Sequence, residues 1–150
     1  MLKGIPAILP PMLVKILMEM GHGDEIVLAD ANFPSASIAK QTVFGEPIYL
    51  PGVGIPELME AILTLMPLDY AVEMPVAGMQ VRIGMPPAEV HDRYREIMVK
   101  YGYQGEQIDF CERFAFYEKA KAAYVVVATG EKARFANLIL KKGVISDPMA

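Results

Sequence analysis

The chain has 150 residues, of which 53% are hydrophobic and 21% charged, and its net charge is −4. This length suits one domain spanning residues 1–150, and folding can bury roughly 70% of the unfolded surface. Because the charged residues are scattered, with no run of Lys or Arg, we expect no nucleic-acid or membrane partner. The high apolar share, with 11 Met, exceeds what a small monomer usually buries and favours a homo-oligomer.

The single cysteine, Cys111, can form no internal disulfide, which suits a reducing cytoplasm. The apolar stretch in residues 1–20 superficially resembles a signal peptide, but three prolines and Lys15 interrupt it. No segment reaches the ~18 uninterrupted apolar residues of a membrane helix. Motifs for nucleotide binding, zinc proteases and serine hydrolases are absent from the sequence, and two distant histidines argue against a catalytic metal site.

Four helices are predicted, and prolines open the first three of them. The first follows Pro11, and the second starts at Pro56. The third, residues 88–101, is the most polar, and we expect its His91 to face water. The fourth covers residues 114–123.

Short apolar runs bounded by polar or turn residues predict the strands. The clearest runs are residues 25–29 and 124–129, whereas residues 31–46 have the composition of a loop. Shorter candidates are the segments 47–50, 70–76, 108–110 and 137–144. Because helices and strands alternate, we expect an α/β fold, a single-domain three-layer sandwich whose largely parallel sheet is flanked by helices.

Two polar residues flank the strand predicted at residues 25–29. His22 lies between two glycines before it, and an imidazole in water titrates near pH ~6.5, so His22 can exchange protons at neutral pH. A helix-ending turn that happens to contain a histidine explains the same three residues. Asp30 ends the strand, where open α/β sheets bind ligands, and it is equally compatible with a turn-capping role.

The separation of these two residues imposes a condition on any shared site. If residues 24–29 form one straight strand, His22 and Asp30 lie ~20 Å apart at ~3.3 Å per residue. Either the turn folds back sharply, or the site is built across a subunit interface.

Two later segments offer groups that could hold ligand hydroxyls. Arg113 presents a fixed fork of donors, although it could equally pair with a surface carboxylate. The neighbouring Phe114 and Phe116 are expected in the core or in an interface. Asn137, in the triplet that begins with Phe135, both donates and accepts hydrogen bonds, but it also suits an ordinary loop.

Three segments resemble the fucose mutarotase and ribose pyranase family. They are MLKGIPAILPPMLVKILMEMGHGDEIVLADANFP, ERFAFYEKAKAAYVVVATGE and NLILKKGV, and they occur in the family's order along the chain. The resemblance is weakest in residues 45–105. The segment RFAFYE begins with arginine and therefore resembles the fucose branch of the family, because the ribose branch usually has histidine at that position.

The resemblance implies a histidine acid/base at His22 and sugar contacts from Asp30, Arg113 and Asn137. It also implies homo-oligomers with sites near subunit contacts, and activity without a metal or organic cofactor. The sequence departs from the family at Phe135, where tyrosine is common; the ring is kept but a hydroxyl that contacts sugar is lost. That contact would be lost, taken over by water, or supplied by Tyr117 or another residue.

The activity implied by the resemblance is mutarotation of a free monosaccharide, L-fucose above all, with His22 exchanging a proton during ring opening and closure. General acid/base catalysis of ~10²–10⁴-fold would suffice, since the reaction already proceeds in water. A monosaccharide-binding or regulatory protein without catalysis is the alternative that Phe135 keeps open. An aldose–ketose isomerase is a third alternative.

Overall fold

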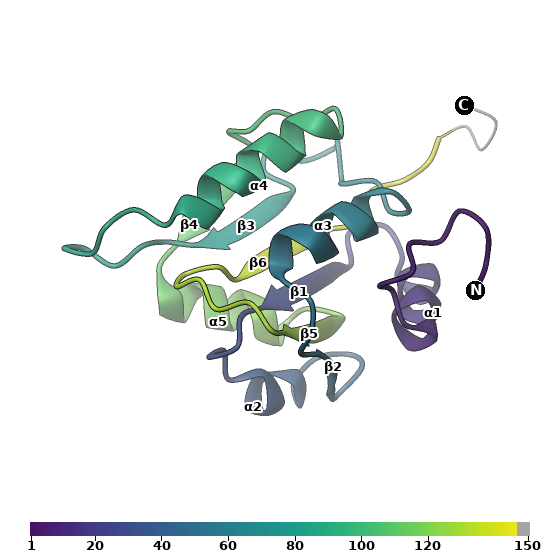
Figure 1. Ribbon diagram of the computed structural model, residues 1–150, viewed down its shortest axis with the longest axis horizontal. Coiled ribbons are helices and arrows are strands. Elements are labelled where there is room, and N and C mark those ends of the chain that lie inside the picture. Colours follow the sequence, from purple (N-terminus) through teal and green to yellow (C-terminus); the bar gives the residue numbers. More distant parts are fainter. Residues whose placement is uncertain (147–150) are drawn as a thin grey trace.

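A computed structural model describes residues 1–146, and it shows one sheet between two layers of helices (Figure 1). The strands in this part of the chain are β1 (Glu25–Ala29), β2 (Pro47–Leu50), β3 (Val76–Met79), β4 (Ile108–Cys111), β5 (Val125–Thr129) and β6 (Leu138–Lys141). The helices are α1 (Pro11–Glu19), α2 (Ser35–Ala39), α3 (Ile55–Leu63), α4 (Glu89–Lys100) and α5 (Arg113–Lys121).

The sheet has six strands within residues 1–146, in the order β2-β5-β1-β6-β3-β4. The pairs β2–β5, β1–β5 and β3–β4 are parallel, which confirms the predicted largely parallel sheet. The exception is β6, which lies between β1 and β3 and runs antiparallel to both. As a result, β6 begins at the edge where its neighbours end and ends at the edge where they begin.

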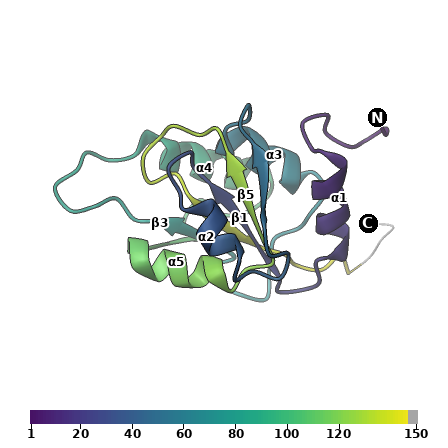
Figure 2. The same cartoon turned by 90° about the horizontal axis from the view of Figure 1, so that it is seen from below.

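Alternate residues of the central strands bury against opposite helical layers. Ile26 and Leu28 of β1 join the core formed with α1, α3 and α4, whereas Val27 and Ala29 join the core formed with α2 and α5. Helices on both faces explain why β1 is a continuous apolar run rather than an alternating one. Figures 1 and 2 show the two helical layers on either side of the sheet.

Two secondary-structure expectations were wrong: one strand starts later than predicted, and one predicted loop contains a short helix. The segment 70–76 is mostly turns, and the strand starts only at Val76, because the proline at 75 cannot donate a ladder hydrogen bond. The segment 31–46 is not all loop, since Ser35–Ala39 forms α2. Ile38 and Ala39 bury against the smaller core, an apolar signal that the surrounding proline and serines obscured.

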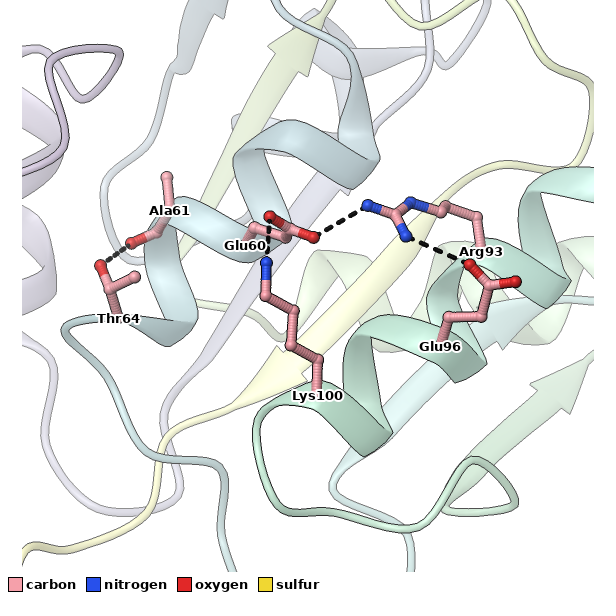
Figure 3. Close-up of polar contacts among 6 residues, drawn as sticks. All are labelled: Glu60, Ala61, Thr64, Arg93, Glu96 and Lys100. Atoms are coloured by element: carbon pink, nitrogen blue, oxygen red, sulfur yellow. Dashed lines mark hydrogen bonds and ion pairs between the residues drawn. The ribbon is translucent and has the colours of Figure 1, made fainter.

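Helix α4 is joined to α3 by a charge network centred on Glu60 (Figure 3). The Glu60 carboxylate accepts hydrogen bonds from Arg93 at 2.9 Å and from Lys100 at 3.1 Å, and Arg93 also pairs with Glu96.

The loop between β3 and α4, residues 80–88, projects from the body of the molecule (Figure 2). Within residues 1–146, no helix combines the length and the apolar character needed to cross a membrane.

Candidate active site

His22 pairs with Asp69 at the edge of the sheet where β1 begins. The His22 Nε2 atom lies 3.1 Å from Asp69 Oδ1; the His22 side chain is 51% exposed and that of Asp69 is 5% exposed. A carboxylate can only accept, so the contact places the proton on Nε2 and the lone pair of a neutral His22 on Nδ1. We refer to His22 and Asp69 as the amino-end pair.

Backbone hydrogen bonds to the end of β6 fix the chain at both members of the amino-end pair. Gly23 N–H donates to the Lys142 carbonyl at 2.8 Å, and Asp69 N–H donates to the Lys141 carbonyl at 3.0 Å. Gly23 has φ 85°, a left-handed backbone that favours glycine and lets the chain turn from α1 into β1. The predicted turn is therefore present, and its backbone is fixed.

The surroundings of Asp69 favour its ionised, carboxylate form. Burial alone would raise the pKa of Asp69, but hydrogen bonds from Ala71 and His22 and the charge of Lys141 outweigh it and lower the pKa below the usual range. The Ala71 N–H donates to the same Oδ1 atom at 3.0 Å. Asp69 thus remains a carboxylate that can orient the imidazole and stabilise its protonated form.

Asp30 and Asn137 form a buried pair at the opposite edge of the sheet. The Asp30 N–H donates to Asn137 Oδ1 at 2.7 Å, and Asn137 Nδ2 donates to Asp30 Oδ2 at 2.9 Å. Asp30 is 8% exposed and Asn137 3%. Burial raises the pKa of Asp30, although hydrogen bonds from Asn32 and Asn137 oppose the change. Asn137 reaches Asp30 because β6 starts beside the end of β1.

Arg113 and Phe135 meet in a hollow at this same edge. Both line a cavity of about 460 Å³ whose other walls come from Glu112 and from residues 80–83. Arg113 is the exposed first residue of α5, and its guanidinium carbon lies 4.6 Å from the centre of the Phe114 ring. We refer to Asp30, Arg113, Phe135 and Asn137 as the carboxyl-end group.

Three aromatic residues of the RFAFYE segment have different environments. Phe116 is fully buried, as expected for a core residue, whereas Phe114 is exposed. Tyr117 is half-buried and packs edge-on against Phe33, with ring centres 5.4 Å apart. Phe33 follows the Asp30 turn, so Tyr117 belongs to the neighbourhood of the carboxyl-end group.

The structure brings four of the five predicted site residues to one edge and leaves His22 at the other. Regular pairing of β1 with β5 and β6 from Glu25 to Ala29 separates His22 from Asp30. The sharp fold-back considered as one way to join them is therefore wrong. Within residues 1–146, no cluster of three or more His, Cys, Asp or Glu side chains is arranged to hold a metal ion.

Two residues of functional interest were not found from the sequence. Asp69 was given no role, since it lies just before the strand expected at residues 70–76 and its partner His22 is 47 positions away. His91 was expected to face water but is only 7% exposed, because its ring packs against Phe110 and its Nε2 contacts the Phe135 carbonyl. The polar composition of α4 concealed this buried face.

The fold and the sequence place the chain in a known class of proteins that includes sugar mutarotases. Residues 3–145 match the RbsD / FucU transport protein family. The chain belongs to this family. Its curated relatives include the fucose mutarotase of Bos taurus, which is 49% identical over 97% of this chain and 95% of the relative. The L-fucose mutarotase of Actinobacillus pleuropneumoniae serotype 5b (strain L20) is 44% identical over 96% of this chain and 97% of its own.

Solved structures agree with this placement. The fucose mutarotase from Streptococcus pneumoniae, crystallised in complex with L-fucose, superposes with a TM-score of 0.90 at 49% identity, covering 96% of this chain and 99% of that one. FucU from Bifidobacterium longum gives a TM-score of 0.90 at 46% identity, with 95% and 99% covered. RbsD of Bacillus subtilis, complexed with D-ribose, gives 0.68 at 24% identity, with 91% and 95% covered, which shows a shared fold. The predicted family and fold class are confirmed.

Proposed function

We propose that this protein is a mutarotase that interconverts the anomers of a free monosaccharide, L-fucose, by general acid/base catalysis. The observation that carries the proposal is the half-exposed imidazole of His22, whose Nε2 is held by the buried carboxylate of Asp69. Its Nδ1 lone pair is then available to a ligand. The curated relatives named fucose mutarotase favour catalysis over sugar binding alone.

Mutarotation requires two proton transfers and the breaking of one bond. A proton leaves the anomeric hydroxyl, a proton reaches the ring oxygen, and the bond between C1 and the ring oxygen breaks to give the open-chain aldehyde. Rotation about the C1–C2 bond and re-closure with the reverse transfers give the other anomer. His22 would exchange one of these protons, and Asp69 would stabilise the imidazolium that forms. No step needs redox or group-transfer chemistry, so we propose that no cofactor takes part.

The carboxyl-end group would hold the sugar. Arg113 donates to hydroxyl oxygens, the Asp30 carboxylate accepts from hydroxyls, and Phe135 offers an apolar ring to one face of the sugar. Asn137 would act mainly by fixing Asp30, since both ends of its amide are engaged by that residue. The hollow between Arg113 and Phe135 has ample volume for a monosaccharide.

We further propose a homo-oligomer in which the amino-end pair of one subunit meets the carboxyl-end group of another. The support is the separation of His22 from Asp30 by the whole of β1. Large apolar side chains that are exposed in the single chain would provide contact surface. They include Met18, Val43, Tyr49, Ile83 and Phe114.

A cytoplasmic location completes the proposal. Its support is the single, half-buried Cys111, which suits a reducing compartment, and the absence of any basic run in a chain of net charge −4. A small free sugar is then the expected partner, with no nucleic acid or membrane involved.

The test is exchange NMR on the anomeric protons of L-fucose, with D-ribose in parallel, after addition of micromolar protein. We expect wild-type protein to accelerate exchange of L-fucose anomers and His22→Ala to remove the acceleration. Line broadening with unchanged exchange would point instead to a sugar-binding protein without catalysis. Full activity in a folded His22→Ala protein would overturn the assignment of His22.

A further inference from the structure

The loop between β5 and β6 contains two members of the carboxyl-end group, Phe135 and Asn137. It spans residues 130–137, and Phe135 within it has φ 59°, in the left-handed region that bulky residues rarely adopt. Such a backbone persists only where surrounding contacts hold it. The next two residues carry the chain into β6 and place Asn137 beside Asp30.

The start of this loop is fixed by Glu131. Its side chain accepts hydrogen bonds from Ala133 N–H at 2.9 Å and from Ile55 N–H at 3.2 Å. Its carbonyl accepts from Ala31 N–H at 2.8 Å, which ties the loop to the Asp30 turn. The left-handed turn at Phe135 needs a separate anchor, four residues further on.

That anchor is a pair of side chains on α4. His91 Nε2 lies 2.7 Å from the Phe135 carbonyl oxygen, and the Tyr94 hydroxyl donates to the Ala136 carbonyl at 2.6 Å. His91 and Tyr94 are three positions apart, so they share one face of the helix and reach two successive carbonyls. A carbonyl oxygen only accepts, so Nε2 of His91 carries the proton.

The surroundings of His91 hold its ring in this orientation. The Phe110 ring of β4 packs against it with centres 4.4 Å apart, and Tyr94 lies 6.2 Å away. The charged groups of α4 that face it are Asp92 and Arg95, which pair with each other at 2.8 Å. The Glu60 network joins α4 to α3 (Figure 3), so the donor rests on a fixed helix.

We propose that His91 is a positioning residue of the sugar site, which holds the Phe135 carbonyl so that the left-handed turn presents Phe135 to the hollow and Asn137 to Asp30. His91 also lines a second cavity beside the β3–α4 loop, and this cavity shares residues 80–83 with the hollow. Its function is therefore to shape the binding surface, whereas Tyr94, fully buried, anchors the interior side of the same turn. The inference rests on the proposed function for the identity of the ligand.

Two substitutions separate the hydrogen bond from the packing of the ring. His91→Phe keeps an aromatic ring against Phe110 but removes the donor, and His91→Gln restores an N–H donor without the ring. We expect His91→Phe to raise KM for L-fucose about five- to tenfold with kcat within about twofold. His91→Gln should recover much of that loss. Equal KM values for His91→Phe and wild-type protein would overturn the proposal.

A matched control removes a buried hydrogen bond elsewhere. Near α2, the Thr42 hydroxyl donates to the Ala39 carbonyl at 2.6 Å and accepts from Gly45 N–H at 3.2 Å, and Thr42→Val deletes both bonds at nearly constant volume. We expect Thr42→Val to lower stability with KM unchanged. A KM increase in Thr42→Val equal to that in His91→Phe would show a general stability effect and contradict a positioning role.

Measurements without sugar keep the inference distinct from the proposed activity. In the free protein, ¹⁵N NMR should show His91 as the Nε2–H tautomer, and His91→Phe should shift the backbone amide signals of Ala136, Asn137 and Asp30. The Nδ1–H tautomer, or unchanged signals at these three residues, would contradict the proposal. Absence of anomer exchange in the wild-type protein would overturn the proposed function alone, and the amide signals would still decide the positioning role.

Discussion

The two ends of the central sheet carry polar groups of opposite character. At the carboxyl ends of β1 and β5, Asp30 and Asn137 are buried and bonded to each other. At the amino end of β1, His22 is half-exposed, and one buried carboxylate, Asp69, holds it. A buried, fully bonded pair suits recognition of a fixed hydroxyl pattern, whereas an exposed imidazole suits proton exchange. We therefore propose that the sugar binds at the first end and that proton transfer takes place at the second.

Loss of Asn137 should affect stability far more than loss of His22. Asn137→Ala leaves the buried Asp30 N–H and carboxylate without their partner, so we expect the free energy of unfolding to fall by about 2–4 kcal/mol. His22→Ala removes a half-exposed side chain and leaves Asp69 its hydrogen bond from Ala71 N–H, so it should change the free energy of unfolding by less than about 0.5 kcal/mol. Urea denaturation measures both, and both variants should lose activity. Equal losses of stability would contradict the contrast between the two ends.

Neutralising Asp69 should affect the rate rather than sugar binding. Asp69→Asn keeps an acceptor for Ala71 N–H but removes the charge that stabilises protonated His22, so we expect kcat to fall roughly tenfold. KM should change little, because Asp69 contacts His22 and not the residues proposed to hold the sugar. Anomer-exchange NMR over a range of L-fucose concentrations separates the two constants. A rise in KM with kcat unchanged would place Asp69 in binding instead.

The two aspartates should have opposite effects on the pH dependence of stability. Burial and the opposing hydrogen bonds leave the pKa of Asp30 above its usual 3.8, so the folded state binds more protons there, and stability falls as pH rises from 3.8 through the raised pKa. The pKa of Asp69 is lowered, so its effect on stability has the opposite sign. Its contribution to the free energy of unfolding is fully present above pH 3.8 and is lost as the pH falls through the lowered pKa.

Free energies of unfolding measured against pH would check both signs. The stability of wild type minus that of Asp30→Asn should decrease as pH rises above 3.8, and the corresponding difference for Asp69→Asn should increase as pH rises toward 3.8. Slopes of the same sign would show that the two carboxylates do not have the different environments described above.

Restoring a hydroxyl at position 135 should give the smallest effect. Phe135 lines the hollow with Arg113, so the hydroxyl introduced by Phe135→Tyr should contact the sugar and raise affinity for L-fucose roughly two- to fivefold. Titration by NMR measures the change, with Tyr117→Phe as a comparison that removes the neighbouring hydroxyl. Unchanged affinity in Phe135→Tyr would mean that the position does not contact the sugar.

Local patterns were sufficient to predict most of the fold. β1 was placed at its correct bounds because both of its faces are buried, which makes it a continuous apolar run. The helix after Pro11 was found because proline fits the first turn and apolar residues follow at helical spacing. The strand at Val76–Met79 was misplaced because Gly78, which fits tightly against Phe110, gives no apolar signal.

The candidate site could be predicted only residue by residue. Asp30 and Asn137 were both proposed, but their pairing depends on β6 lying antiparallel between β1 and β3, which no local pattern shows. Asp69 and His91 were missed because their partners lie 47 and 44 positions away, and the polar composition of α4 also concealed the buried face of His91. Long-range pairing of strands, rather than residue type, determines these contacts.

Complementation between two inactive variants would test the central claim most directly. His22→Ala lacks the proton carrier at one end of the sheet, and Arg113→Ala lacks an exposed sugar contact at the other. If the site joins opposite ends of two subunits, oligomers refolded from an equal mixture should recover about a quarter of wild-type anomer exchange, since that share of interfaces would combine intact His22 with intact Arg113. A mixture no more active than the separate variants would contradict a site shared between subunits.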